Sequence, residues 1–285
     1  MKRLKYFLLS LGVLAVVTLF LSRNEGSWLE RLRLFARIDW IEDRVPRISA
    51  TPTSDPMTRT LVAGDDVNIS ADDLPQMEPA IAVNPTDPDN IVAVYFGITA
   101  EGEQRCSYAY TKDGGATWQG KVAYPDLPFT TSADPVVTVS RDGVFYISCL
   151  NLSLDLSAAF SVHRSTDGGE TWSDIVLTGE TSGNDFIDKQ WTTIDNSGGT
   201  YDGRYYLAHM YVPDLNEQAT QIEIRYSDDG VDFSPGIRVS DPENDMNQGV
   251  IPAVGGDGTV YAVWRKISID SGANAIMFDK STDGG

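Results

Sequence analysis

The sequence predicts an all-β fold, a β-propeller of four-stranded antiparallel blades, and three observations support that prediction. A short motif recurs, and its aspartates lie 54, 62 and 54 residues apart, at Asp113, Asp167, Asp229 and Asp283. This period fits a propeller blade and is longer than a helical repeat. Runs rich in β-branched residues, bounded by turn-forming residues, fill each interval. No helical periodicity appears after residue 75.

Composition and charge limit the classes of protein and partner. The chain has 285 residues, of which 41% are hydrophobic, so it can bury a core and is not a disordered polymer. The net charge of −19 is uneven: residues 1–60 carry ten Lys and Arg against six Asp and Glu, and residues 61–285 carry twelve against thirty-five. An acidic body repels phosphate polyanions. We therefore expect no nucleic-acid partner.

Residues 1–23 are expected to be a signal peptide or a signal anchor, forming an N-terminal hydrophobic helix. Lys2, Arg3 and Lys5 precede an apolar run over 6–22, as in an export signal. No Ala-x-Ala cleavage pattern follows the run, which favours an uncleaved anchor over a removed peptide. The protein is therefore expected to be exported. It would be anchored in the membrane through this segment and face outside the cytoplasm, or be secreted if the signal is cleaved.

Residues 24–74 are expected to connect this segment to the propeller. Apolar residues recur at three-to-four spacing over 27–43 with arginines between them, which predicts a short amphipathic helix next to the membrane. The stretch 46–56 is rich in Pro, Thr and Ser and is typical of a linker. The propeller itself is expected over 75–285.

The expected strands follow the same order in each period of the propeller. First strands are predicted at 79–83, 135–139, 190–194 and 250–254, and second strands at 91–96, 144–149, 204–209 and 260–264. Third strands are predicted directly before the repeated motif, at 106–110 and 222–226. Clusters of Gly, Pro, Asn and Asp between these runs indicate turns.

The repeated motif carries a family resemblance. It reads Thr-Lys-Asp-Gly-Gly-Ala-Thr-Trp at 111–118 and Ser-Thr-Asp-Gly-Gly-Glu-Thr-Trp at 165–172, with partial copies at 227–233 and 281–285. It resembles the Asp-box, or BNR repeat, of the sialidase superfamily, and over roughly 75–285 the chain is similar to bacterial exo-α-sialidase-like proteins. The resemblance implies a six-bladed propeller of which about four blades are present, so a C-terminally truncated propeller is expected. Residues expected to hold turns and pack between strands are Asp113, Gly115, Trp118, Asp167, Gly169, Trp172, Asp229 and Asp283.

Candidate site residues flank the first strands, because the innermost strands of a propeller line a channel whose mouth binds ligands. The resemblance implies a glycoside hydrolase that uses carboxyl groups as acid and base and arginines as a clamp for a sugar carboxylate. An acid recurs near the first strand in three of the periods. Turn capping is the alternative role for these acids. The candidate catalytic residues are Asp134, Glu78 and Asp188, and the candidate substrate-binding residues are Arg265, Lys189 and Gln248; Asp185 and Asn247 flank the same strands.

The histidines and cysteines are candidate metal ligands or disulfide partners. His163 and His209 lack a third ligand at metal spacing, so no cofactor or metal is expected. The alternative is a bound Ca²⁺ ion, because the stretch 195–202 is rich in side chains with oxygen ligands. Cys106 and Cys149 either form one disulfide or remain buried thiols.

Two functions stay open at the level of sequence. One is an extracytoplasmic, sialidase-like glycoside hydrolase that binds or hydrolyses a glycan or glycoconjugate. The other is a non-catalytic propeller scaffold that binds a carbohydrate or protein partner. Only seven arginines occur over 75–285, which favours the scaffold, and no tyrosine can be assigned as a nucleophile.

Overall fold

The computed structural model describes residues 66–70, 75–99, 102–122 and 129–285. These residues form fifteen strands and no helix, so the all-β prediction is confirmed. The predicted hydrophobic helix, amphipathic helix and linker over 1–65 lie outside the described residues. In the part of the chain that the structure describes, no helix has the length and hydropathy that a membrane span requires.

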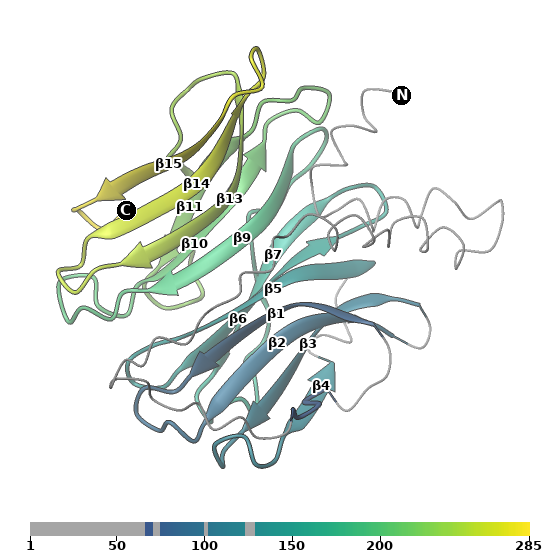
Figure 1. Cartoon of the computed structure of the whole chain (residues 1–285), viewed down its shortest axis with the longest axis vertical. Coiled ribbons are helices and arrows are strands. Elements are labelled where there is room, and N and C mark those ends of the chain that lie inside the picture. The colour runs from purple at the N-terminus through teal and green to yellow at the C-terminus, as the bar shows by residue number, and fades with distance from the viewer. Residues whose placement is uncertain (1–65, 71–74, 100–101, 123–128) are drawn as a thin grey trace, which may run out of the picture. The chain divides into compact units, whose positions relative to one another are not determined.

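The strands form four antiparallel sheets, one from each sequence period (Figure 1). The first sheet contains β1 (Gln76–Val83), β2 (Ile91–Ile98), β3 (Gln104–Thr111) and β4 (Gln119–Val122). The second contains β5 (Thr131–Val139), β6 (Phe145–Leu152), β7 (Ala158–Ser165) and β8 (Val176–Thr178). The third contains β9 (Phe186–Ile194), β10 (Tyr205–Val212), β11 (Gln221–Ser227) and β12 (Ile237–Arg238). The fourth contains β13 (Asp245–Val254), β14 (Val260–Ser268) and β15 (Asn274–Ser281).

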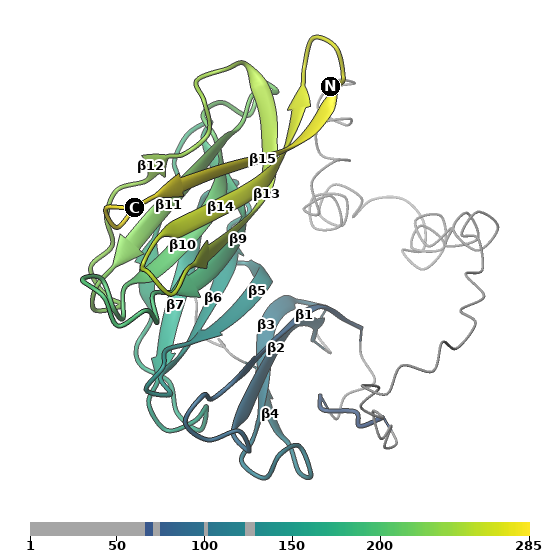
Figure 2. The same cartoon turned by 60° about the vertical axis from the view of Figure 1, so that its left-hand side comes forward.

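Successive sheets pack face to face, as propeller blades do. Their innermost strands are neighbours in the order β1, β5, β9, β13 (Figures 1 and 2). Between the first two sheets, Val92 and Tyr108 pack in one apolar cluster with Phe145. Between the last two, Tyr206 packs in another cluster with Trp264. Burial of this apolar surface stabilises each pair of blades, and the predicted four blades are present.

The repeated motif forms hairpin turns that also link neighbouring blades. Asp167 accepts hydrogen bonds from the Ser165 hydroxyl at 2.8 Å and the Thr171 amide at 3.0 Å. Burial of Asp167 opposes its ionisation, but the Thr171 and Ser165 bonds outweigh it and lower the pKa to about 2. Trp172 packs edge-on against Tyr108 of the first blade, with ring centroids 5.3 Å apart. The hairpin therefore contributes both a rigid turn and a contact between blades.

In the other copies of the motif, the aspartate also accepts hydrogen bonds from hydroxyl or amide groups of its own turn. Asp113 accepts bonds from the Thr111 hydroxyl and the Thr117 amide, at 2.7 and 2.9 Å. Asp229 accepts bonds from the backbone amides of residues 231 and 232. Asp283 accepts a 2.6 Å bond from the Ser281 hydroxyl. The glycines of the turns have positive φ, including 93° at Gly115 and 96° at Gly169, a conformation that favours glycine.

A disulfide joins the first two blades. Cys106 on β3 is bonded to Cys149 on β6 across a sequence separation of 43 residues. Both residues are fully buried in the apolar cluster between the two sheets. Of the two alternatives open from the sequence, the structure therefore has the disulfide.

Each innermost strand is longer than predicted because it contains a β-bulge. The register with the neighbouring strand shifts between Met77 and Ala80 in β1 and between Ala133 and Val136 in β5. Equivalent shifts occur over 188–191 in β9 and 248–251 in β13. Two of the predicted first strands begin at Pro79 and Pro135, and proline cannot donate to a sheet ladder. A bulge interrupts that ladder and lets the strand pass through Pro79 and Pro135.

Candidate functional site

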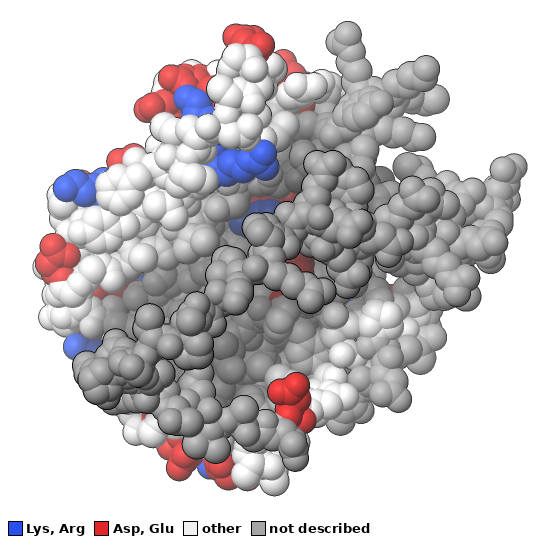
Figure 3. Space-filling model, viewed as in Figure 1, with Lys and Arg blue, Asp and Glu red and all other residues white. Residues whose placement is uncertain are grey.

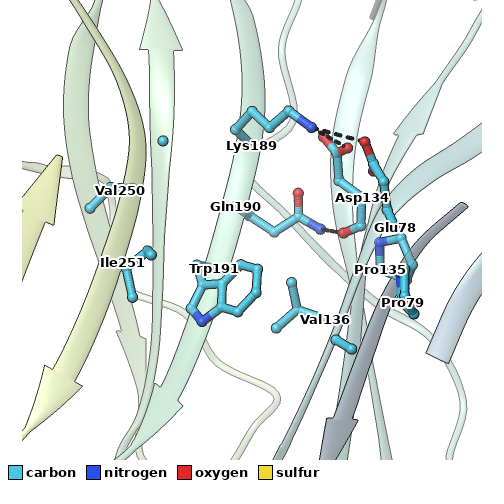
Figure 4. A pocket seen from close by; sticks show the side chains of 12 residues that line it. Glu78, Pro79, Asp134, Pro135, Val136, Lys189, Gln190, Trp191, Val250 and Ile251 are labelled. Carbon is cyan, nitrogen blue, oxygen red and sulfur yellow. Dashed lines mark hydrogen bonds and ion pairs between the residues drawn. The ribbon is translucent and has the colours of Figure 1, made fainter. Parts of the chain in front are cut away.

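The four bulges surround one pocket with a volume of about 340 Å³ (Figure 4). Each innermost strand contributes three consecutive residues, namely 78–80 from β1, 134–136 from β5, 189–191 from β9 and 249–251 from β13. The pocket therefore lies where the innermost strands of all four blades meet. Its volume falls within the range of about 300–1,000 Å³ common for small-molecule sites.

The backbone has positive φ at the same position of each bulge, which is a strained conformation for the three residues other than glycine. Glu78, Asp134 and Lys189 have positive φ values of 53°, 49° and 53°, and Gly249 has 69°. Among the described residues, Leu156 is the one further non-glycine residue with positive φ. Such conformations cost about 1–3 kcal/mol and are concentrated at functional sites. The sequence predicted an acid at the equivalent place in the first three blades. The strand register shows that this prediction was wrong for the third blade, where Lys189, and not Asp188, is equivalent to Glu78 and Asp134.

Lys189 joins the two acids of the neighbouring blades. Its ammonium nitrogen lies 2.9 Å from Asp134 Oδ1 and 3.2 Å from Glu78 Oε1 (Figure 4). The Asp134 side chain is 10% exposed and that of Lys189 is 27% exposed, so these ion pairs are only partly screened by water. Three blades thus place one charged group each into a single cluster.

The surroundings shift the pKa values of Glu78 and Asp134 in opposite directions. Burial raises the pKa of Glu78 to about 7, with further contributions from its hydrogen bond to Asp134 and from the Asp134 charge. Burial also opposes ionisation of Asp134, but the hydrogen bond from Glu78 and the charge of Lys189 outweigh it and lower the pKa of Asp134. Near neutral pH Asp134 is therefore ionised while Glu78 still holds its proton in part.

Asp188 lies beneath this cluster as a fully buried carboxyl group. Burial and the neighbouring Asp134 charge raise its pKa well above the usual value. Both of its carboxyl oxygens and Asp134 Oδ2 are buried without a hydrogen-bond donor in the described structure. A proton on Asp188 supplies that donor, since a neutral carboxyl can donate to the Asp134 carboxylate. Asp188 therefore supports Asp134 from behind and is shielded from solvent.

Two residues next to Lys189 were not among the sequence candidates. The Gln190 side-chain amide donates a 2.6 Å hydrogen bond to the backbone carbonyl of Asp134, which holds β5 and β9 together at the bulge. Trp191 lines the pocket and is 41% exposed, although large aromatic side chains are buried on average. An exposed indole in a pocket can stack on the apolar face of a sugar ring. The pattern that could have identified it is an aromatic residue three positions after a candidate acid.

Gln248 and Arg265 line a second, adjoining pocket of about 360 Å³. This pocket shares Lys189, Gly249 and Ile251 with the first. The Arg265 guanidinium donates through Nε and Nη2 to Asn274 Oδ1 at 3.2 and 2.8 Å. Arginine is not among the residues that line the first pocket in the described chain.

The remaining sequence candidates lie elsewhere. Asp185 accepts a 2.9 Å bond from the backbone amide of Ser182 and caps a turn. Asn247 is buried and accepts a 2.9 Å hydrogen bond from the Trp264 indole. Burial lowers the pKa of His163 to about 4 and that of His209 to about 3, so both are neutral. Within the described residues, no three His, Cys, Asp or Glu side chains are grouped to hold a metal ion.

Charged side chains of both signs occur on one face of the described structure (Figure 3). On the face in Figure 3, the acidic and basic side chains of the described residues lie interspersed. Binding to a nucleic-acid backbone uses a continuous basic patch. The described part of this face has no such patch (Figure 3).

Comparison with known proteins identifies similar folds. No protein-family model matches the sequence, and no curated protein sequence matches it. A protein of unknown function from Dyadobacter fermentans has a TM-score of 0.56 at 17% identity, over 76% of this chain and 68% of that one. An α-L-arabinanase from Penicillium chrysogenum, solved with arabinobiose, has a TM-score of 0.54 at 15% identity, over 73% of this chain and 63% of that one.

A second enzyme shows a similar likeness. The GH93 α-L-arabinofuranosidase of Fusarium graminearum, also solved with arabinobiose, has a TM-score of 0.53 at 16% identity, over 73% of this chain and 63% of that one. The chain thus spans less than two thirds of the length of these two enzymes. At such identities the likeness shows the fold alone. This chain has the blade architecture found in propeller glycoside hydrolases.

Proposed function

We propose that the pocket at the four bulges binds a glycan and hydrolyses a glycosidic bond. The observation that carries the proposal is the cluster of Glu78, Asp134 and Lys189, held on strained backbone in a ligand-sized pocket. Structural strain and separated protonation states are both concentrated at catalytic sites. The likeness to two sugar-cleaving propellers supports the choice of substrate class.

The proposed chemistry assigns different roles to the two carboxyl groups. Glu78 keeps its proton up to a pKa of about 7 and would donate it to the oxygen of the departing sugar. Asp134 is ionised and would stabilise the positive charge that develops on the sugar ring. After the leaving sugar departs, a water molecule would attack the anomeric carbon and give its proton to the Glu78 carboxylate, which restores the acid. Both carboxyl groups contact one ammonium nitrogen, at 3.2 and 2.9 Å. They are thus too close to hold a water molecule between them, as an inverting pair does.

The test is hydrolysis by the full-length protein. We expect release of the chromophore from at least one of two probes, an aryl α-L-arabinofuranoside and an aryl α-sialoside, the second representing the exo-α-sialidase resemblance. The rate should fall as the pH rises through about 7, because Glu78 then loses its proton.

Two variants identify the residue responsible. Glu78→Gln should lower the rate about 100-fold or more, whereas Glu103→Gln, which removes an exposed glutamate paired with Arg105, should not. The hydrolase proposal fails if neither probe is cleaved or if Glu78→Gln is as active as the unmodified protein.

A non-catalytic propeller that binds a carbohydrate or protein partner is the second candidate. Lys189 favours it, because its single ammonium group contacts both of the carboxyl groups that catalysis would use and neutralises the charge of Asp134. This alternative predicts that the sugar or a protein partner binds without turnover. A Glu78→Gln variant would then bind as tightly as the unmodified protein.

We also propose that the propeller lies outside the cytoplasm. The charged and apolar residues of 1–23 support export, as does the Cys106–Cys149 disulfide, since such bonds persist in oxidising compartments. Protease added to intact cells that make the full-length protein should digest the propeller if segment 1–23 anchors it. Retention of undigested propeller inside the cells would refute export.

A further inference from the structure

The Cys106–Cys149 disulfide lies at the level of the bulges that carry the two acids. In β5 the ladder to β6 is interrupted at Asp134, and Cys149 is the residue of β6 opposite the interruption. In the first blade, Cys106 of β3 and Met77 of β1 pair with the same residue of β2, and Met77 directly precedes Glu78. The disulfide therefore joins the two blades beside both carboxyl groups.

Noncovalent contacts occupy the same level between the other blades. Between the second and third blades, the equivalent residues are Phe160 and His209, whose ring centroids are 5.0 Å apart. Between the third and fourth blades, they are Ile222 and Trp264, which belong to one apolar cluster. Among the described blades, a covalent bond at this level thus occurs only between the two that carry the acids.

Further contacts hold the chain just before Asp134 to the strand that carries Cys106. The Ser132 hydroxyl accepts a 2.7 Å hydrogen bond from the Cys106 backbone amide. The Cys106 sulfur lies 3.6 Å from the carbonyl oxygen of Ala133, the residue that precedes Asp134. Strand β3 of the first blade therefore supports the bulge of the second, and the disulfide fixes β3 to β6 on the other side of that bulge.

The Asp134 backbone needs such support. Asp134 has φ of 49°, and a conformation of this kind persists only where its surroundings restrain it. Its carboxylate also lies 2.9 Å from the Lys189 ammonium and accepts a hydrogen bond from Glu78. Catalytic groups are effective only within about 0.5 Å of their working positions. Movement of β3 relative to β6 would lengthen the contact between the two acids.

We propose that the Cys106–Cys149 disulfide is a positioning element that holds Glu78 and Asp134 in one cluster, so that the site is complete only in the oxidised protein. This inference rests on the proposed hydrolase function and adds its dependence on redox state. Both cysteines are buried and neither lines the pocket. Bond formation passes two electrons and two protons from the two thiols to a disulfide oxidant, which becomes a dithiol. Such bonds form in oxidising compartments, so the site is assembled after export.

The test compares the unmodified full-length protein with a variant that combines Cys106→Ala and Cys149→Ala. Ile222→Ala is the matched control, because it weakens the equivalent contact between the third and fourth blades. Loss of a buried isoleucine side chain and loss of a disulfide lower stability to a similar extent. Thermal unfolding verifies this and sets a temperature at which all three proteins are folded. The first readout is the carbon-13 NMR titration of the Glu78 carboxyl group without ligand.

In the oxidised protein we expect a Glu78 midpoint of about 7. Without the disulfide the midpoint should fall by about one pH unit or more, because water reaches the cluster and Asp134 moves away from Glu78. On the aryl glycoside that the unmodified protein cleaves, kcat should fall about tenfold or more with a smaller change in KM. Ile222→Ala should preserve the midpoint and kcat. An unchanged midpoint in the double cysteine variant, or an equal fall in Ile222→Ala, would overturn the positioning role.

The reduced form of the unmodified protein gives a second comparison, in which only the bond and two protons differ. Refolded with dithiothreitol, it should titrate as the double cysteine variant does, and agreement with the oxidised protein would overturn the proposal. If neither thiol form nor double variant folds, the bond acts on stability and not on position, which also overturns it. If the disulfide shifts the Glu78 midpoint but the oxidised protein cleaves no glycoside, the proposed function fails while the positioning of the two acids stands.

Discussion

Replacing Lys189 by methionine should leave a buried negative charge without its partner. Asp134 is 10% exposed, and its Oδ1 lies 2.9 Å from the Lys189 ammonium. Removing one member of a buried ion pair costs about 3–5 kcal/mol. Because Lys189 is 27% exposed and Asp188 and Glu78 can share protons with Asp134, we take the lower end of that range. Lys189→Met should therefore lower the free energy of unfolding by about 3 kcal/mol at pH 7.

The double variant separates the ion pair from lost packing. Adding Asp134→Asn to Lys189→Met removes the unpaired charge, so the double variant should be more stable than Lys189→Met alone. The coupling energy of this cycle should be about 2 kcal/mol, within the range for contacting residues. Equilibrium unfolding in urea, followed by tryptophan fluorescence at low salt, measures all four proteins.

An exposed ion pair provides the control for this cycle. Lys112 contacts Glu170 with side chains that are 46% and 49% exposed, and such surface pairs contribute about 0–1 kcal/mol. Lys112→Met should therefore change stability little. Additive losses in the Lys189 and Asp134 cycle, or a loss for Lys189→Met no larger than that for Lys112→Met, would refute a stabilising charge cluster at the bulges.

Two further changes test the buried groups. Asp188 has a raised pKa, so its contribution to stability is complete below its unfolded pKa of about 3.9 and is lost as the pH rises towards the folded value, by up to about 1.4 kcal/mol per pH unit. Asp188→Asn should thus become more stable relative to the unmodified protein as the pH rises above 4 in urea unfolding, and parallel pH profiles would exclude a protonated Asp188. Replacing Cys106 and Cys149 together by alanine should lower stability by about 4 kcal/mol, from the loop-closure entropy of a 43-residue separation. Guanidinium unfolding measures that loss, and a value below about 1 kcal/mol would contradict a disulfide that restrains the unfolded chain.

Much of the fold could be predicted because it depends on local patterns. The Asp-box residues form a turn through contacts within a few positions, such as those of Asp167 with Ser165 and Thr171. Such short-range hydrogen bonding is encoded directly by residue type. The repeat period then predicted the number and order of the sheets, although the fourth sheet has three described strands where four were predicted.

The site could be predicted only in part because it depends on strand register. Glu78 and Asp134 were identifiable from their places before Pro79 and Pro135, at the start of apparent strands. Which residue of the third blade joins them depends on a bulge that shifts β9 against β10. A shift of one residue moves every side chain to the other face of a sheet. Sequence alone therefore could not decide between Asp188, which is buried, and Lys189, which enters the pocket.

Two further residues that line the pocket could be identified only from the structure. Gly249 is one of 25 glycines in the chain, and its neighbours do not reveal that it faces two cavities. Trp191 is a large aromatic residue of the kind that is usually buried, yet it alternates with the buried Gln190 and Thr192 and is exposed in the pocket. Both roles follow from how the innermost strands of different blades approach each other, which sequence periodicity does not specify.

A titration of the Glu78 side chain tests the central claim most directly. Carbon-13 NMR of the glutamate carboxyl signals, with Glu78→Gln used to assign the resonance, gives its pKa in the full-length protein without any ligand. A midpoint of about 7 is expected, and it should fall in Asp134→Asn, because the neighbouring carboxylate contributes to the shift. A midpoint near the ordinary value of 4.5, or one unaffected by Asp134→Asn, would contradict a coupled acid pair at the centre of the four bulges.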